Sequence, residues 1–130
     1  MILSTPEVDL TESGDSFQTN LGLDTSLRSL MPVNLLYANG SDLRDPLISP
    51  LFADFSAGFP ATILITGTRD LFLSNTVRMH QALRTADIFA DLHVVEAGGH
   101  GNFPFGPEAG AIDQHVRRFI ETVVGTKSQA

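Results

Sequence analysis

The chain has 130 residues, of which 42% are hydrophobic and 18% charged, so its composition is that of one globular domain rather than of a disordered segment. Its net charge is −7, and its eight Lys and Arg residues are scattered, which argues against binding to nucleic acid or to an anionic membrane surface. The absence of cysteine excludes disulfides, thiol catalysis and most structural zinc sites.

The first half of the chain, residues 1–59, is rich in loops. The opening residues MIL fit the end of a strand, whereas the segment 9–20 is polar and turn-forming. Asp24 is a suitable N-cap, which predicts a short helix over TSLRSL, residues 25–30.

A second short helix is predicted over residues 33–38, because Pro32 suits a first helical position and Asn39-Gly40 suits a helix end. The following segment, 42–60, contains three prolines. It is expected to be an extended but ordered connection that packs through Leu47, Leu51 and Phe52.

The second half, residues 60–125, is more regular. Residues 61–66, ATILIT, form a continuous apolar run bounded by Pro60 and Gly67. Such a run is typical of a strand that is covered on both faces, and therefore of a parallel sheet.

A helix is predicted over residues 73–86 and a second strand over 90–97, ADLHVVEA. Pro107 is expected to open the last helix and Gly125 to end it as a C-cap. The stripes predicted to be buried are Val77, His80, Leu83 and Ala86 in the first helix, and Ile112, Val116, Phe119, Ile120 and Val123 in the last. The order strand, helix, strand, helix predicts an α/β fold with a right-handed crossover, as in a doubly wound sheet.

The loops after the two predicted strands carry the residues of chemical interest. The first, GTRD, contains Asp70, and the second, AGGHGNF, contains His100. Ligands of open α/β sheets bind beyond the carboxyl ends of the strands, and the loops of two parallel neighbours leave the same edge of the sheet. We therefore expect Asp70 and His100 to meet, helped by the backbone freedom of glycines 98, 99 and 101.

A carboxylate that holds a histidine is half of a nucleophilic apparatus. The acid fixes the imidazole tautomer, and the other ring nitrogen can take a proton from a serine hydroxyl. The order of acid before base matches the last two members of an α/β-hydrolase triad, whose serine comes earlier in the chain.

The order and spacing of four segments are informative: DPLISPLFAD (45–54), PATILITGTRDLFLSN (60–75), ADLHVVEAGGHGNF (90–103) and the predicted terminal helix. This ordered set resembles the C-terminal part of an α/β-hydrolase of the hormone-sensitive-lipase-like esterase family. Residues 3–20 also resemble the segment after the sixth strand of that fold, although Glu7 stands where an aromatic residue is expected. The resemblance implies a single partial domain, 1–130, with two to three parallel strands and covering helices.

By this resemblance Asp70 is the triad acid and His100 the triad base of a carboxylic-ester hydrolase that acts on a short acyl or aryl ester without an organic or metal cofactor. The family's G-x-S-x-G elbow and HGGG loop have no counterpart in the sequence. Gly14-Asp15-Ser16 and Gly40-Ser41 both break the pattern. We therefore expect no ester hydrolysis by this chain alone.

Plainer interpretations exist for the same residues. Asp70 could be a turn or N-cap aspartate, and His100 a turn residue, while His80, His93 and His115 are assigned no function. A metal site is not expected, because no H-x-x-x-H, H-E-x-x-H or D-x-D-x-D-G spacing occurs. Ser74 is interpreted as a helix-start residue, and the residues expected to pack in the core are Phe52, Phe55 and Phe59.

Two or three parallel strands are marginal alone, so we expect association, either with a separately encoded N-terminal half or between copies of the chain. The rival interpretation is a non-catalytic truncated protein or an interaction module that uses its exposed sheet edge. The start MILSTPEVD has no basic region, so it does not resemble a signal peptide, and a cytoplasmic location is expected.

Overall fold

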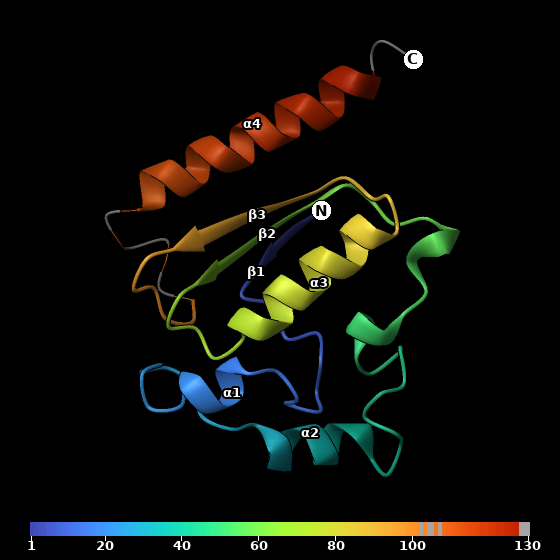
Figure 1. The fold of residues 1–130 in the computed structure, drawn as a ribbon, viewed down its shortest axis with the longest axis vertical. Helices are drawn as coiled ribbons and strands as arrows, with labels where there is room; N and C mark the ends of the chain where they lie inside the picture. The colour runs from blue at the N-terminus through green and yellow to red at the C-terminus, as the bar shows by residue number, and fades with distance from the viewer. Residues whose placement is uncertain (102, 104–105, 107, 128–130) are drawn as a thin grey trace.

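A computed structural model describes residues 1–101, 103, 106 and 108–127. Its centre is a sheet of three parallel strands in the order β1 (Ile2–Ser4), β2 (Thr62–Gly67) and β3 (Ala90–Val95). Figure 1 shows the three arrows running in the same direction. The predicted parallel arrangement and the strand in the opening residues are therefore confirmed.

Strand β2 lies in the middle of the sheet, and all six of its residues are buried. Its apolar run is explained by helices on both faces: α3 (Leu73–Thr85) covers one face and α4 (Ala109–Lys127) the other (Figure 1). The predicted strand–helix–strand–helix order is thus the observed one.

The two faces of the sheet have separate cores because successive side chains of a strand point to opposite sides. On the α3 side, Leu64 of β2 packs in a cluster with Met79 and Leu83. On the α4 side, Ile65 and Val95 form a second cluster with Phe103. Burial of one such side chain typically contributes about 1.5–3 kcal/mol.

The buried face of α3 differs from the predicted one. Its buried residues are Asn75, Thr76, Met79 and Leu83, whereas Val77, His80 and Ala86 are only partly buried. The helix is rotated because the first half of the chain bonds to this polar face: the Asn75 side-chain oxygen accepts two backbone hydrogen bonds, and the Thr76 hydroxyl donates to the Phe72 carbonyl. The Asn75 amide nitrogen is buried and has no hydrogen-bond partner among the described residues. A hydrophobic pattern cannot show polar side chains that are buried in this way.

Residues 25–30 do not form the predicted helix. Asp24 does accept hydrogen bonds from the backbone N–H groups of Ser26 and Leu27, as a cap would. The helix fails to propagate because the N–H of Leu30 donates to the Glu12 carboxylate rather than to a carbonyl four residues earlier. The polar segment before it holds a short helix that was not predicted, α1 (Ser16–Thr19).

The second short helix is confirmed as α2 (Met31–Ala38), which begins one residue before Pro32 and ends at Asn39 in a left-handed conformation. The segment 42–60 contains two 3₁₀ turns, η1 (Pro50–Phe52) and η2 (Phe55–Ala57). Leu51 and Phe59 pack against the core and Phe55 is buried within it.

Leu47 does not pack as predicted, because its side chain is 90% exposed. It follows Pro46 in a turn in which the Asp45 carboxylate accepts the N–H of Leu47, and this turn directs the side chain outward. Phe52 is half-buried beneath the Arg44 guanidinium, which lies 5.2 Å from the ring centre.

Helix α4 continues through Gly125 to Lys127, so the predicted C-cap is wrong. Gly125 is absent from the glycines with positive φ, which is the conformation that a terminating glycine adopts. Within the predicted stripe Phe119 is buried, but Ile120 is 45% exposed. Pro107, the expected first residue of this helix, lies outside the described residues.

In the part of the chain that the structure describes, no helix is both long enough and apolar enough to cross a membrane.

Candidate functional site

Asp70 lies in a tight turn between β2 and α3. Its N–H donates to the carbonyl of Gly67, the last residue of β2, and its own carbonyl accepts from the N–H of Leu73, which begins α3. The Asn20 amide donates to the Asp70 carbonyl at 2.8 Å. The turn is therefore fixed from both neighbouring elements and from the first half of the chain.

The Asp70 carboxylate is completely buried and fully hydrogen-bonded. Oδ2 accepts from the Thr66 hydroxyl at 2.8 Å, and Oδ1 accepts from the Phe72 N–H at 2.9 Å. Burial of a carboxylate without hydrogen-bond donors would destabilise the fold by several kcal/mol. Even an uncharged buried group that lacks its hydrogen bond costs about 1–3 kcal/mol. These two donors let an ionised acid remain inside the protein.

The loop after β3 is held directly against the loop after β2. Strand β3 ends at Val95, two residues before the predicted boundary at Ala97. Ala97 takes a positive φ of 56°, and its N–H donates to the Thr68 hydroxyl. The Arg69 N–H donates to the Gly98 carbonyl at 2.9 Å. Gly67 makes this contact possible, because a Cβ at that position would lie 2.1 Å from the Gly98 oxygen.

This arrangement brings His100 to Asp70, as the sequence predicts: Nδ1 of the ring lies 3.2 Å from Asp70 Oδ1. An ionised carboxylate only accepts hydrogen bonds, so Nδ1 carries the proton and Nε2 presents its lone pair. The Phe72 and His100 rings meet edge to face, with ring centres 5.0 Å apart. The His100 side chain is 26% exposed, whereas that of Asp70 is inaccessible.

Asp24 is hydrogen-bonded to the loop of Asp70, a role that its predicted capping function did not include. It is 2% exposed, and its Oδ2 accepts the N–H of Leu71, which follows the triad acid candidate. Burial raises the pKa of Asp24, but backbone N–H groups of Leu71, Ser26, Leu27 and His100 outweigh burial and lower the pKa overall. Asp24 thus ties the loop of Asp70 to the first half of the chain.

Glu7, the residue that departs from the family pattern, lies within electrostatic reach of His100. Burial raises the pKa of Glu7, while a hydrogen bond from the Asn34 amide at 3.1 Å and the nearby imidazole oppose the rise. The site therefore has a second, half-buried carboxyl group in its surroundings.

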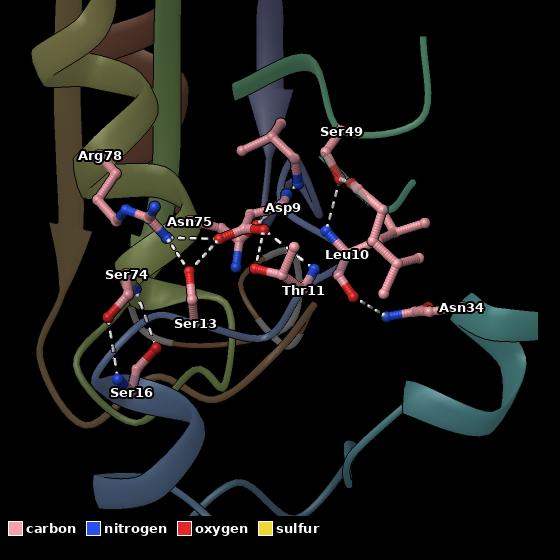
Figure 2. Close-up of polar contacts among 12 residues, drawn as sticks. Asp9, Leu10, Thr11, Ser13, Ser16, Asn34, Ser49, Ser74, Asn75 and Arg78 are labelled. Carbon is pink, nitrogen blue, oxygen red and sulfur yellow. Dashed lines mark hydrogen bonds and ion pairs between the residues drawn. The ribbon is translucent and has the colours of Figure 1, made fainter. Parts of the chain in front are cut away.

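A polar cluster fastens residues 8–16 to the first turns of α3 (Figure 2). The Asn75 side-chain oxygen accepts the N–H groups of both Val8 and Asp9, and the Asp9 carboxylate pairs with Arg78 at 2.6 Å. Ser16 and Ser74 exchange two hydrogen bonds between backbone and hydroxyl groups. Ser74 lies in the first turn of α3, which confirms its interpretation as a helix-start residue.

The remaining histidines lie outside this dyad. His80 is half-buried on α3, whereas His93 and His115 meet between β3 and α4. Desolvation and the neighbouring His115 lower the pKa of His93, against the opposing influence of Glu108 and Asp91. Sequence spacing gave no sign of this pair, because its members are 22 residues apart on different elements.

In the described part of the chain, no serine hydroxyl is hydrogen-bonded to the His100 ring, and no three His, Asp or Glu side chains form a metal centre. The site consequently holds an orienting acid and a base whose Nε2 is available, and it can take up a proton from a group delivered to that nitrogen.

A family model described as alpha/beta hydrolase fold matches residues 1–104. The chain belongs to this family. Among solved structures, that of an esterase named E25 is 43% identical and superimposes with a TM-score of 0.86. An esterase from the bacterial hormone-sensitive lipase family is 28% identical, with a TM-score of 0.81. These findings confirm the resemblance stated from the sequence.

The match covers nearly all of this chain but only part of its relatives. It includes 94% of this chain in both structures, against 39% of the first esterase and 41% of the second. A curated esterase of Acinetobacter venetianus is 29% identical over 91 residues, which are 68% of this chain and 30% of that protein. The chain therefore spans about two fifths of the solved α/β hydrolases that it matches.

The contact between Gly67 and Gly98 generates the first prediction. Gly67→Ala should lower the free energy of unfolding by about 1–3 kcal/mol, because the added methyl group must push the two loops apart. The matched control is Gly125→Ala, where the added methyl group would point into open space. The control should be neutral or stabilising by up to about 1 kcal/mol. Urea unfolding distinguishes the two, and equal effects would contradict the proposed role of the contact.

The lowered pKa of Asp24 generates a prediction about pH. Because the folded-state pKa lies below the ordinary value of about 4, the stability that the carboxylate contributes is complete above that pH and is lost as pH falls through the folded-state pKa. Asp24→Asn should therefore be less stable than the original chain at pH 7, and the gap should narrow near pH 3.

Urea midpoints of both proteins at the two pH values test this expectation. Asp15→Asn is a suitable control, because Asp15 is exposed and its side chain makes no capping hydrogen bond. The control should change the unfolding free energy by no more than about 0.5 kcal/mol. A gap between Asp24→Asn and the original chain that stays constant down to pH 3 would contradict the prediction.

Proposed function

We propose that this chain supplies the acid and the base of a carboxylic-ester hydrolase, with Asp70 and His100 as two members of a Ser-His-Asp triad. The observation that carries the proposal is the 3.2 Å contact between the Asp70 carboxylate and His100 Nδ1, at the carboxyl ends of adjacent parallel strands. Its support is that the solved structures it resembles include esterases, one of them 43% identical.

In this reaction His100 Nε2 accepts the proton of a serine hydroxyl as the serine oxygen attacks the ester carbonyl. The resulting imidazolium is stabilised by Asp70 and returns its proton to the departing alkoxide. A water molecule then attacks the acyl-serine carbonyl while His100 Nε2 takes its proton. The bond to the serine oxygen breaks, the imidazolium returns the proton to that oxygen, and the carboxylic acid is released. Asp70 keeps its charge throughout and holds the ring in the required tautomer.

The serine and the donors of the oxyanion hole must come from elsewhere, because the sequence has no G-x-S-x-G elbow and no HGGG loop. Loss of one oxyanion donor alone typically lowers the rate about 10²–10³-fold. The chain alone is therefore proposed to be inactive, and the substrate to be a short acyl or aryl ester when a complementing half is present. No organic or metal cofactor takes part in this chemistry.

The surface supports association with such a half or with another copy. On the outer strand β1, Met1 and Ile2 are 48% and 51% exposed. A further group of exposed apolar residues lies on α2: Val33, Leu35, Leu36 and Tyr37. The described residues also include exposed apolar side chains elsewhere, among them Leu47, which is 90% exposed. Exposed apolar residues of this number on a small chain favour burial by a partner.

The alternative is a non-catalytic truncated protein or an interaction module. The same exposed strand edge favours it, since an edge can pair with another chain without any chemistry. A coding region upstream with an HGGG loop and a G-x-S-x-G elbow would favour the split esterase, and its absence the alternative. A cytoplasmic location stays a prediction from the sequence.

Hydrolysis of p-nitrophenyl butyrate tests the enzyme proposal. The chain alone should show no turnover above background, because it lacks a nucleophile. Co-expression with the N-terminal part of a related esterase, comprising the strands, elbow and oxyanion loop, should restore hydrolysis.

In the complemented enzyme His100→Ala should lower kcat at least about 10³-fold, since the base is lost. His80→Ala, on the half-buried face of α3, is the matched control and should retain activity. Hydrolysis by the isolated chain that His100→Ala abolishes would show that a nucleophile is present in it. Full activity of the complemented His100→Ala variant would exclude His100 as the base.

Size-exclusion chromatography with light scattering tests the association. The isolated chain should elute as a dimer or larger species, because exposed apolar surface is removed from water when copies pair. Complementation should replace that species by a heterodimer. A compact monomer with cooperative unfolding would contradict the expectation.

A further inference from the structure

Two imidazole rings from different elements meet on the α4 side of the sheet. His93 lies on β3 and His115 on α4, with their Nδ1 atoms 2.8 Å apart and their ring centres 5.1 Å apart. Asp91 precedes His93 by two residues, so the two side chains lie on the same face of β3. This pair has no part in the proposed chemistry of Asp70 and His100.

The protonation of the pair follows from its partners. His115 Nε2 lies 2.7 Å from Asp91 Oδ2, so Nε2 donates to the carboxylate and Nδ1 of a neutral His115 is a lone pair directed at His93. His93 Nδ1 then donates to that lone pair. If His93 instead carries its proton on Nε2, both Nδ1 lone pairs converge on one point between the rings.

Two converging imidazole nitrogens are a preferred ligand set for Zn²⁺, Cu²⁺ and Ni²⁺. Metal-bound histidines commonly donate their other N–H to a carboxylate, which is the relation of His115 to Asp91. With metal–nitrogen bonds of about 2.0–2.1 Å, two nitrogens of a tetrahedral site lie roughly 3.4 Å apart. The rings would have to separate by only about half an ångström from their 2.8 Å contact.

The surroundings leave room for a hydrated ion. A hollow of about 420 Å³ adjoins the rings and is lined by Asp91, His93, His115 and Arg118 among others. The side chain of His115 is 25% exposed and that of Asp91 43% exposed, so water can reach the pair. Asp91 and Glu108 both act electrostatically on His93 as negative charges, which favours a cation there. Arg118, which also lines the hollow, opposes them with one positive charge.

We propose that His93 and His115 form a two-histidine site for a divalent transition-metal ion, with Asp91 orienting His115 and water completing the coordination. No third ligating side chain converges on this point among residues 1–101, 103, 106 and 108–127, so the site is open. The bound ion would connect β3 to α4, beside the stacked rings of Phe89 and Phe119. This inference is independent of the proposed hydrolase function.

Isothermal titration of the full chain with ZnCl₂, and separately with NiCl₂, tests the site. Each metal should bind with a stoichiometry of one per chain. His93→Gln and His115→Gln should each weaken binding at least tenfold, because one ligand is removed. Asp91→Asn should weaken it about 10–100-fold through the loss of the orienting carboxylate.

Two controls separate this site from the other histidines. His80→Gln, on α3, and His100→Gln, beside Asp70, should bind the metal as the original chain does. Absence of binding by the original chain would overturn the proposal, and so would unchanged binding by His93→Gln and His115→Gln.

A second measurement needs no substitution and therefore does not depend on the folding of a variant. In the NMR spectrum of the original chain, substoichiometric ZnCl₂ should shift the imidazole signals of His93 and His115 before those of His80 and His100. Shifts that begin at His100 or His80 would overturn the proposal.

Discussion

The close approach of Gly67 and Gly98 is the constraint on which the candidate site depends. A side chain on Gly67 would collide with the Gly98 carbonyl and push the two loops apart. Because Gly67 has none, the loops lie close enough for the Arg69 N–H to donate to that carbonyl. The parallel register of β2 and β3 brings the two loops to one edge, but register alone leaves the imidazole's position open. The contact between backbones places His100 within hydrogen-bonding distance of Asp70.

Much of this core could be predicted because its signals are local. The apolar run of β2 requires two covered faces, and the carboxyl ends of parallel neighbours share an edge, so the meeting of Asp70 and His100 follows from the sequence. Two of the failures come from competition by residues distant in sequence. Glu12 takes the N–H that a helix over 25–30 needed, and the backbone of residues 8 and 9 buries Asn75 on a face that the apolar pattern excluded. No local propensity contains these contacts.

The irregular first half is ordered chiefly by buried anions. Asp9 accepts from two side-chain hydroxyls, a backbone N–H and Arg78, and Asp24 accepts from backbone N–H groups on both sides of a long gap in sequence. Burial raises the pKa of Asp9 as it does that of Asp24, and in both cases the hydrogen bonds outweigh burial and lower it. A loop that lacks repeating backbone bonds can satisfy its N–H groups in this way. The same anions attach the loop to α3 and to the candidate site, so order in the first half and geometry in the second are coupled.

The dyad is assembled by residues of this chain alone, which bears on the choice between the two proposed functions. The donors to Asp70 come from Thr66, Phe72 and His100. The loop of His100 is held by hydrogen bonds to Thr68 and Arg69. A complementing half would therefore have to bring a serine to Nε2 without first creating the acid–base pair. In an interaction module without catalysis, the buried carboxylate would still need all of these donors to offset its desolvation, and it would have no chemical role. The buried, hydrogen-bonded carboxylate therefore favours the proposed hydrolase. The exposed edge of β1 supports association under either proposed function.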